Sequence, residues 1–257
     1  MAAASGRSTE NAGTDAETAE KPSIMIEKVI HRLKSELPAT VKLVAVSKFH
    51  PFESIEEAYR AGQRIFAESR PQELASKVRA LEARRIELDD PGYMSDIEWH
   101  FIGHLQTNKL KLVLPYVSLV QSVDSVRLLD AMDSWGRTSG CVVNVLLEPH
   151  VAAEDTKQGF EAEEVKSILQ AASRGEYKNI RFKGIMGMAT FTDDENVIRS
   201  DFASLLRIYE DSLSEFPSVS ADFQELSIGM SDDYSIAVEY GSTMVRIGSM
   251  IFGLRKI

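Results

Sequence analysis

Cysteine is nearly absent from this chain of 257 residues, and Cys141 is the only one. A disulfide framework and a cysteine metal site within the chain are therefore excluded, and a reducing compartment is expected. Basic residues are also scarce relative to acidic ones, with 29 lysines and arginines against 39 aspartates and glutamates. The resulting formal net charge of −10 argues against an extended surface for nucleic acid or an anionic membrane. The sequence also lacks any apolar run near the ~20 residues that a membrane span needs.

Large apolar residues are almost missing from residues 1–21, which consist mainly of Ala, Ser, Thr, Gly and acidic residues. Such a segment cannot bury enough surface to offset the entropy of ordering, so we predict a disordered acidic tail over 1–21. The tail contains one arginine, Arg7, and several acids, whereas an organelle transit peptide is rich in arginine and poor in acids. We therefore expect a cytoplasmic protein in which residues 22–257 form a single domain.

Apolar segments typical of strands alternate with amphipathic segments typical of helices along the rest of the chain. The predicted strands are 42–47, 64–69, 98–103, 117–123, 142–148, 181–188, 225–230 and 243–248. The predicted helices between them are 52–61, 70–88, 106–114, 125–137, 161–173, 195–215 and 232–240, and a further helix precedes Pro38. Strict alternation implies parallel strands joined by right-handed crossovers. We therefore predict an α/β fold, a single (β/α)8 TIM-type barrel with an extra N-terminal helix. A doubly wound open sheet is the alternative, although no GxGxxG follows the first strand.

Lys48 stands at the end of the first predicted strand, after the apolar run LVAVS. A strand buried on both faces accommodates a charged side chain only at its ends, and the carboxyl ends of barrel strands are where chemistry is assembled. Partial burial there lowers the pKa of a lysine amine and makes the amine a nucleophile toward a carbonyl carbon. Lys48 is therefore a candidate Schiff-base residue. The alternative is a strand-end lysine that only extends to solvent.

Gly248 and Ser249 follow the last predicted strand and open a short apolar segment. Backbone N–H groups at such a position can bind an anion, and barrels often bind phosphate between the loops after the seventh and eighth strands. Ser231, after the seventh strand, could add a hydroxyl donor. Arg246 lies inside the otherwise apolar eighth strand, where a guanidinium is costly to bury without a partner. These residues predict a phosphate site beside a buried cation.

The same rim is thus predicted to hold a phosphate site and a lysine that can form an imine. This combination suits two ligands. One is a sugar-phosphate carbonyl, as in Schiff-base aldolases, and the other is pyridoxal 5'-phosphate (PLP), which carries an aldehyde and a phosphate on one ring. Arg246 favours PLP, because it can donate a hydrogen bond to the ring nitrogen but cannot give that nitrogen a proton. A neutral ring is a poor electron sink, which suits a cofactor carrier or a racemase-like enzyme.

Five segments in order are AVSK (45–48), EWHFIGHLQTNK (98–109), KQG (157–159), GMSDD (229–233) and GSTMVRIGSMIFG (241–253). Together they closely resemble the pyridoxal phosphate homeostasis protein family. The resemblance runs from about Val41 to Gly253, nearly the whole region predicted to fold. It implies a barrel of the alanine racemase type without that enzyme's second domain (PLP fold type III). It also implies PLP bound as a Schiff base and a role in intracellular vitamin B6 homeostasis, with no established reaction.

The resemblance also assigns residues. Lys48 matches the Schiff-base lysine, Arg246 lies by analogy at the pyridine nitrogen, and Ser231 with the backbone at Gly248 and Ser249 would hold the phosphate. The members of the family signature whose roles the sequence does not explain are His100, Gln106, Asn108 and Lys109. His100 could equally be a core histidine.

One segment departs from the family pattern. The family usually has GENYVQE after the second strand, and this chain has AESRPQE (67–73), so Ser69 replaces an asparagine that can face the cofactor. Pro71 is compatible with the first turn of a helix. We expect Ser69 to contribute to cofactor binding. Either the cofactor is held more loosely than in the family, or Arg70 compensates for the missing asparagine.

The function that these features favour is a non-catalytic PLP carrier or buffer, and the alternative is a PLP-dependent racemase-type enzyme acting on amino acids. A two-base racemase needs a second acid or base, and alanine racemases take a tyrosine for it from the domain that is missing here. Tyr59, Tyr234 and Tyr240 lie on predicted helices and not at strand ends. The expected partners are PLP and PLP-dependent apo-enzymes, with no nucleic acid, membrane or metal, and the protein is expected to be a monomer.

Overall fold

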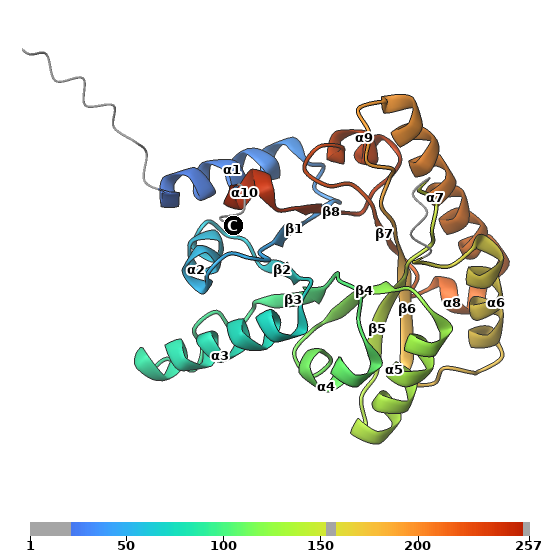
Figure 1. Cartoon of the computed structure of the whole chain (residues 1–257), viewed down its shortest axis with the longest axis horizontal. Coiled ribbons are helices and arrows are strands. Elements are labelled where there is room, and N and C mark those ends of the chain that lie inside the picture. The colour runs from blue at the N-terminus through green and yellow to red at the C-terminus, as the bar shows by residue number, and fades with distance from the viewer. Residues whose placement is uncertain (1–21, 153–157, 254–257) are drawn as a thin grey trace, which may run out of the picture.

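Eight parallel strands close into a barrel that helices surround in the computed structural model, which describes residues 22–152 and 158–253 (Figure 1). The strands are β1 (Lys42–Val46), β2 (Ile65–Glu68), β3 (Glu98–Phe101), β4 (Leu119–Val123), β5 (Val143–Leu147), β6 (Ile180–Met186), β7 (Glu225–Ser227) and β8 (Met244–Ile247). Each strand pairs with the next in sequence, and β8 closes the ring by pairing with β1. The predicted barrel is confirmed, and the predicted tail over 1–21 lies outside the described residues.

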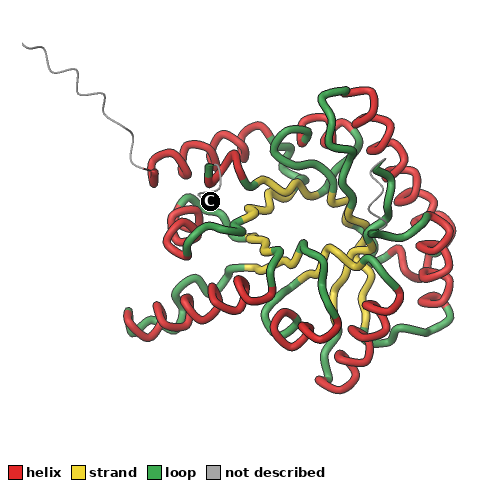
Figure 2. Tube along the Cα trace, in the orientation of Figure 1, coloured by secondary structure: helices red, strands yellow, loops and turns green. Residues whose placement is uncertain are grey.

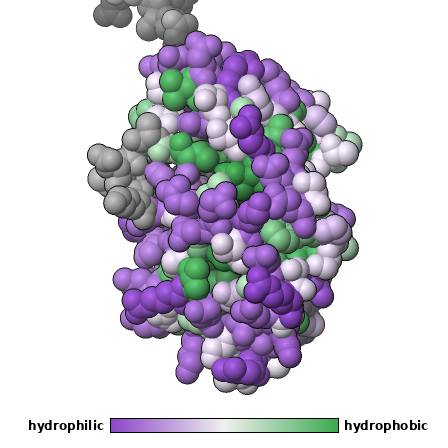
Figure 3. Space-filling view, turned by 90° about the vertical axis from the view of Figure 1, so that its right-hand side faces the viewer, coloured by the Kyte–Doolittle hydropathy of each residue, from purple (hydrophilic) through white to green (hydrophobic). Residues whose placement is uncertain are grey.

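The helices form an outer ring around the strands (Figure 2). They are α1 (Pro22–Glu36), α2 (Phe52–Arg60), α3 (Pro71–Glu87), α4 (Leu110–Val113), α5 (Val126–Ser139), α6 (Ala162–Ser173), α7 (Glu195–Glu215), α8 (Pro217–Ser220), α9 (Tyr234–Glu239) and α10 (Ser249–Phe252), with a 3-10 turn η1 (Thr107–Lys109) before α4. None of the described helices is long and apolar enough to span a membrane. Hydrophilic residues dominate the face in Figure 3, and apolar residues there form small separate patches.

Two apolar clusters hold the barrel together, and strand alternation separates them. In β1, Leu43 and Ala45 belong to the large cluster shared with the helices. Val44 and Val46 belong to a smaller cluster with residues of β2, β4, β5, β6 and β8. A cluster that joins six strands of a closed barrel lies inside it. Successive side chains of a strand point to opposite faces, so these six strands contribute to both clusters.

Local sequence features explain where several helices begin and end. Ser125 caps α5 by accepting a hydrogen bond from the Leu128 N–H, and Gly140 ends that helix in the left-handed region at φ 66°. Pro71 occupies the first turn of α3, as expected for a proline whose missing N–H would have no partner inside the helix.

The predicted strand 225–230 is longer than the strand in the structure, which ends at Ser227. Gly229 follows with φ 96°, a left-handed conformation that interrupts the extended backbone, while its carbonyl still accepts from the Arg246 N–H of β8 at 3.0 Å. Gly184 in β6 has a different role. A Cβ at this position would lie 1.8 Å from the Glu225 carbonyl oxygen, so the close approach of β6 to β7 requires glycine.

Candidate cofactor-binding site

Lys48 lies at the carboxyl rim of the barrel, two residues beyond β1, and is partly buried. Val44 and Val46 face the barrel interior, and Lys48 lies in the turn that directly follows them at the carboxyl end of β1. Ser47 points the other way, because its hydroxyl binds Glu68 and its carbonyl accepts from Lys77 of α3. The barrel thus places Lys48 at its mouth.

The predicted phosphate-binding residues come together near the end of β1, the strand that Lys48 follows. The Ser231 and Ser249 hydroxyls form a hydrogen bond of 3.2 Å, although the two residues are 18 positions apart. A Cβ at Gly248 would lie 3.2 Å from the Val46 carbonyl oxygen, so the backbone at Gly248 lies close to the end of β1. Gly248 is also the N-cap of α10, and the first N–H groups of a helix have no partner within it. We call Ser231, Gly248 and Ser249 the cradle.

Ser69 lies at the carboxyl end of β2, next to β1, and is partly exposed. Its backbone packs against Gly103 of the family signature. A Cβ at Gly103 would lie 2.1 Å from the Ser69 carbonyl oxygen, so only glycine fits there. The structure therefore brings Ser69 to the same rim as Lys48 and explains one glycine of the signature.

Arg70 contacts the residue that follows the lysine. Its guanidinium carbon lies 4.5 Å from the centre of the Phe49 ring, a cation–π contact. Phe49 itself has φ 69°, which is uncommon for a residue other than glycine. Arg70 thus packs against the turn beside Lys48.

Arg246 is buried inside the barrel and has the partners that its burial requires. One terminal nitrogen donates to the Ser227 carbonyl at 2.6 Å and the Ser227 hydroxyl at 2.8 Å, and the other donates to the Gly187 carbonyl at 2.9 Å. Burial lowers the pKa of Arg246 to about 10, opposed by the nearby charges of Glu148 and Asp233, so the guanidinium remains charged at neutral pH. The hydrogen bonds fix the guanidinium plane near the rim.

A chain of polar side chains crosses the barrel interior from Arg246 to His100. The Ser227 hydroxyl accepts from Arg246 and donates to Gln121 Oε1 at 2.7 Å. Gln121 Nε2 then lies 2.8 Å from His100 Nδ1. Since an amide NH2 only donates, Nδ1 accepts and the imidazole is neutral. Burial lowers the pKa of His100 to about 3, with a smaller contribution from Lys42.

His100 is therefore a hydrogen-bonded core histidine, the second of the two roles that its sequence position allows. Sequence reasoning missed Gln121 and Ser227. The signal for Gln121 was present, since a single glutamine stands between apolar residues in the strand LVQSV. No signal in the strand ELS distinguishes Ser227 from an ordinary surface serine.

Acidic groups follow β4 and β5 at the same rim and were also missed. Burial raises the pKa of Glu148 to about 7, helped by Asp124 and opposed by Arg246 and His104. His104 Nδ1 lies 2.6 Å from Asp124 Oδ2. Glu148 is thus a carboxyl group that titrates near neutrality at the barrel mouth, and it could serve as an acid or a base.

The other signature residues lie in the loop after β3. Gln106 and Asn108 are exposed, and the Lys109 N–H donates to the Gln106 carbonyl at 2.9 Å within η1. These contacts shape the loop and assign no chemical role to the side chains. Lys157 of the KQG segment lies outside the described residues.

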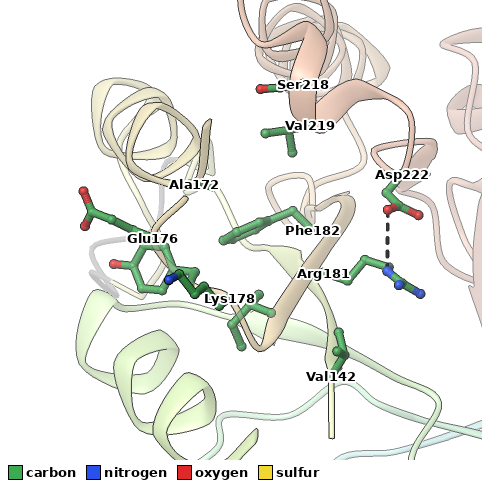
Figure 4. A pocket seen from close by; sticks show the side chains of 11 residues that line it. Val142, Ala172, Glu176, Lys178, Arg181, Phe182, Ser218, Val219 and Asp222 are labelled. Atoms are coloured by element: carbon green, nitrogen blue, oxygen red, sulfur yellow. Dashed lines mark ion pairs between the residues drawn. The ribbon is translucent and has the colours of Figure 1, made fainter. Parts of the chain in front are cut away.

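A pocket of about 240 Å³ lies at the opposite end of the barrel. It is lined by Val142 and Arg181, which stand at the amino ends of β5 and β6, and by Phe182 and Asp222 (Figure 4). Arg181 and Asp222 form an ion pair of 3.5 Å across it. Because barrel sites are built from carboxyl ends of strands, this pocket is not the site that holds Lys48.

The fold and the site together define the class of protein. It is a parallel (β/α)8 barrel with a lysine just beyond its first strand and a serine-containing turn after its last. The family model for the alanine racemase N-terminal domain matches residues 25–256. A pyridoxal phosphate homeostasis protein of Haemophilus influenzae is 35% identical over 217 residues, 84% of this chain and 86% of that protein. The human protein of the same name is 36% identical over 240 residues, 90% of this chain and 82% of that protein. The chain belongs to the pyridoxal phosphate homeostasis protein family, within the alanine racemase N-terminal domain fold.

Solved structures agree with this assignment. PipY of Synechococcus elongatus, solved with PLP bound, has a TM-score of 0.78 and 31% identity, and the match covers 89% of this chain and 100% of PipY. An alanine racemase of Clostridium difficile has a TM-score of 0.65 at 15% identity, and the match covers 92% of this chain and 57% of the racemase. The racemase likeness shows the fold alone.

Proposed function

We propose that this protein binds PLP through a Schiff base to Lys48 and acts in vitamin B6 homeostasis as a carrier or buffer. The observation that supports the proposal is that Lys48 and the cradle residue Gly248 follow the carboxyl ends of two paired strands, β1 and β8. PLP would supply an aldehyde for the amine and a phosphate for the hydroxyl and N–H donors. The PLP-bound structure of PipY, a relative at 31% identity, supports this choice of ligand over a sugar phosphate.

The residues present fit such a ligand. The cradle offers two hydroxyls in mutual contact and the start of a helix, and both are groups that bind phosphate. Arg246 is charged, and its orientation is fixed by the Ser227 and Gly187 carbonyls. In the proposed site it would donate to the ring nitrogen, and Ser69 would contact the cofactor from the neighbouring strand.

A racemase-type enzyme is the second candidate, and Glu148 is the observation that favours it. A rim carboxyl whose burial raises its pKa to about 7 is suited to proton transfer. Two of the three tyrosines considered as second bases are engaged elsewhere. The Tyr234 hydroxyl donates to Glu36 at 2.8 Å, and the Tyr59 hydroxyl donates to Asp96.

Borohydride reduction followed by peptide mapping tests the carrier proposal. Purified protein incubated with PLP should show the visible absorbance of an imine, and reduction should leave the label on the peptide that contains Lys48. A labelled peptide that lacks Lys48 would refute the assignment. Alanine racemisation should be absent in the wild type, and activity that is lost in Glu148→Gln would establish the enzyme instead.

We further propose a cytoplasmic monomer that supplies PLP to apo-enzymes. The single cysteine supports a reducing compartment, and a net charge of −10 favours a soluble monomer. Transfer is tested by mixing the PLP-loaded protein with a PLP-dependent apo-enzyme and following the recovery of that enzyme's activity. Light scattering tests the oligomeric state.

A further inference from the structure

A buried ionic cluster lies between the end of the first two strands and helix α3. Lys77 Nζ is 2.6 Å from Glu68 Oε1 and 2.8 Å from Glu73 Oε1. The side chains of Lys77 and Glu68 are 6% and 0% exposed. Glu68 Oε2 has no hydrogen-bond partner among the described residues, and burial raises the pKa of Glu68. Because desolvation offsets much of the attraction in such a pair, net stability is a weak explanation for the cluster.

The cluster holds the main chain on both sides of Lys48. Lys77 Nζ donates to the Ser47 carbonyl at 2.7 Å, and Glu73 Oε1 accepts from the Phe49 N–H at 2.5 Å. The Ser47 carbonyl belongs to the peptide unit before the Lys48 Cα, and the Phe49 N–H belongs to the unit after it. Both peptide units that flank this Cα are therefore bound by side chains of one ionic cluster.

Two further contacts fix the same segment. The Ser47 hydroxyl donates to Glu68 Oε1 at 2.6 Å, so that Ser47 is held through its side chain and its carbonyl. Phe49 adopts φ 69°, a conformation that needs support in a residue other than glycine. The Glu73 carboxylate on its N–H and the Arg70 guanidinium over its ring provide that support.

We propose that Lys77, Glu68 and Glu73 are the positioning group for Lys48, which set the direction of its side chain toward the cradle. The inference rests on the proposed Schiff-base role of Lys48. A covalent bond to a ligand whose phosphate is already anchored requires the amine within a narrow range of position and angle. The cluster provides that restriction from outside the barrel, without contacting the ligand.

The α2–α3 region contains a matched control pair. Arg84 Nε of α3 lies 3.0 Å from Glu56 Oε1 of α2, and the Glu56 side chain is 6% exposed. The Glu56 carboxylate also accepts a hydrogen bond from the Tyr93 hydroxyl at 2.8 Å. Removing this pair also takes one cation from α3 and one buried carboxylate from an element packed beside it, but it leaves the segment 47–49 untouched.

The test compares Lys77→Met/Glu68→Gln with Arg84→Met/Glu56→Gln, in the full chain loaded with PLP. The readout is the fraction of bound PLP that borohydride fixes to Lys48, together with the rate of PLP loss and the melting temperature. Removing second-layer partners of metal ligands typically costs about 10–100-fold in affinity, and we expect a loss of covalent attachment in that range for the first variant. The control should have a lower melting temperature than the wild type and the same fraction of PLP fixed covalently to Lys48.

The outcomes separate this inference from the proposed function. A wild-type protein that forms no adduct at Lys48 would refute the Schiff-base role itself. If the wild type forms the adduct, a wild-type covalent fraction in the first variant would overturn the positioning role, as would equal losses in both variants. If the first variant does not fold, Glu73→Ala replaces it, because Glu73 is 20% exposed and supports the Phe49 N–H. A wild-type covalent fraction in Glu73→Ala would likewise overturn the inference.

Discussion

Lys48 and Arg246 are both cations near one rim, but their surroundings give them different chemistry. Arg246 is 4% exposed and donates to two backbone carbonyls, so it is a fixed charge. Lys48 is only partly buried, and its flanking peptide units are held by Lys77 and Glu73. A fixed guanidinium can orient a ring, whereas a positioned amine can form a bond. At the scale of single residues, the groups that hold each cation in place determine its role as much as residue type does.

Lys48→Ala should remove the covalent adduct and its absorbance, yet leave weaker binding through the cradle. The two anchors are chemically separate, since the imine needs the amine and the phosphate needs hydroxyl and N–H donors. Hydrogen bonds to a charged group contribute about 1.5–3 kcal/mol each, so a few of them can hold the ligand at roughly micromolar concentration. Calorimetric titration with PLP measures the remaining affinity. No detectable binding would mean that the cradle is misplaced, and an undiminished imine would implicate another lysine, such as Lys109.

His100 should make stability depend on pH in acid solution. Its pKa falls from 6.5 to about 3 on folding, so the unfolded state binds more protons between these values. Stability should therefore decrease as the pH falls from 6.5 toward 3, by an amount on the order of a few kcal/mol. Glu148 has the opposite slope between 4.5 and about 7, because burial raises its pKa.

The difference between wild type and His100→Gln isolates the histidine, since Glu148 contributes equally to both. Urea unfolding at several pH values gives the two stability curves. The variant should lose less stability than the wild type as the pH falls below 6.5. Parallel curves would show that the histidine does not titrate on unfolding in this range.

At the scale of elements, close approaches between loops decide where the site residues lie. Gly103 follows β3 and packs against the Ser69 backbone that follows β2. Gly103→Ala would bring a Cβ to within 2.1 Å of the Ser69 carbonyl oxygen, so the two loops would have to separate. We expect a loss of about 1–3 kcal/mol in the free energy of unfolding, as for other overpacked sites, with weaker PLP retention.

Gly92→Ala is the matched control for that change. Its nearest neighbour is a carboxylate oxygen of Asp90 at 3.3 Å, at the end of a side chain that can move. Chemical denaturation of both variants provides the comparison. Equal stability of Gly103→Ala and wild type would show that the β2 and β3 loops are free to move apart.

At the scale of the whole molecule, closure of the barrel makes one site from distant segments. β8 pairs with β1, and this pairing brings the turn at Gly248 beside the end of β1, some 200 positions away in sequence. The interior polar chain likewise joins β3, β4, β7 and β8. Binding and stability should therefore depend on the intact ring and not on the N-terminal tail.

Deletion of residues 1–21 should leave PLP affinity and melting temperature unchanged, because the composition of the tail gives it no apolar surface to pack. Calorimetry and thermal melting of the full-length and truncated proteins test this directly. Weaker PLP binding after truncation would show that the tail contributes to the site.

The sequence by itself determined the barrel and the position of Lys48 at a strand end, and it predicted the residues proposed for the cradle. These predictions depend on local sequence patterns. Periodicity indicates strands and helices, and a lysine, glycine or serine directly after an apolar strand is recognisable within a few positions. Only the tertiary structure decided the partners of Arg246, the neutral state of His100, the raised pKa of Glu148 and the ionic cluster around Lys77. Gln121 meets Ser227 across 106 positions, and Lys77 meets Ser47 across 30. Such contacts depend on strand register and helix placement around the closed ring, and no local pattern encodes them.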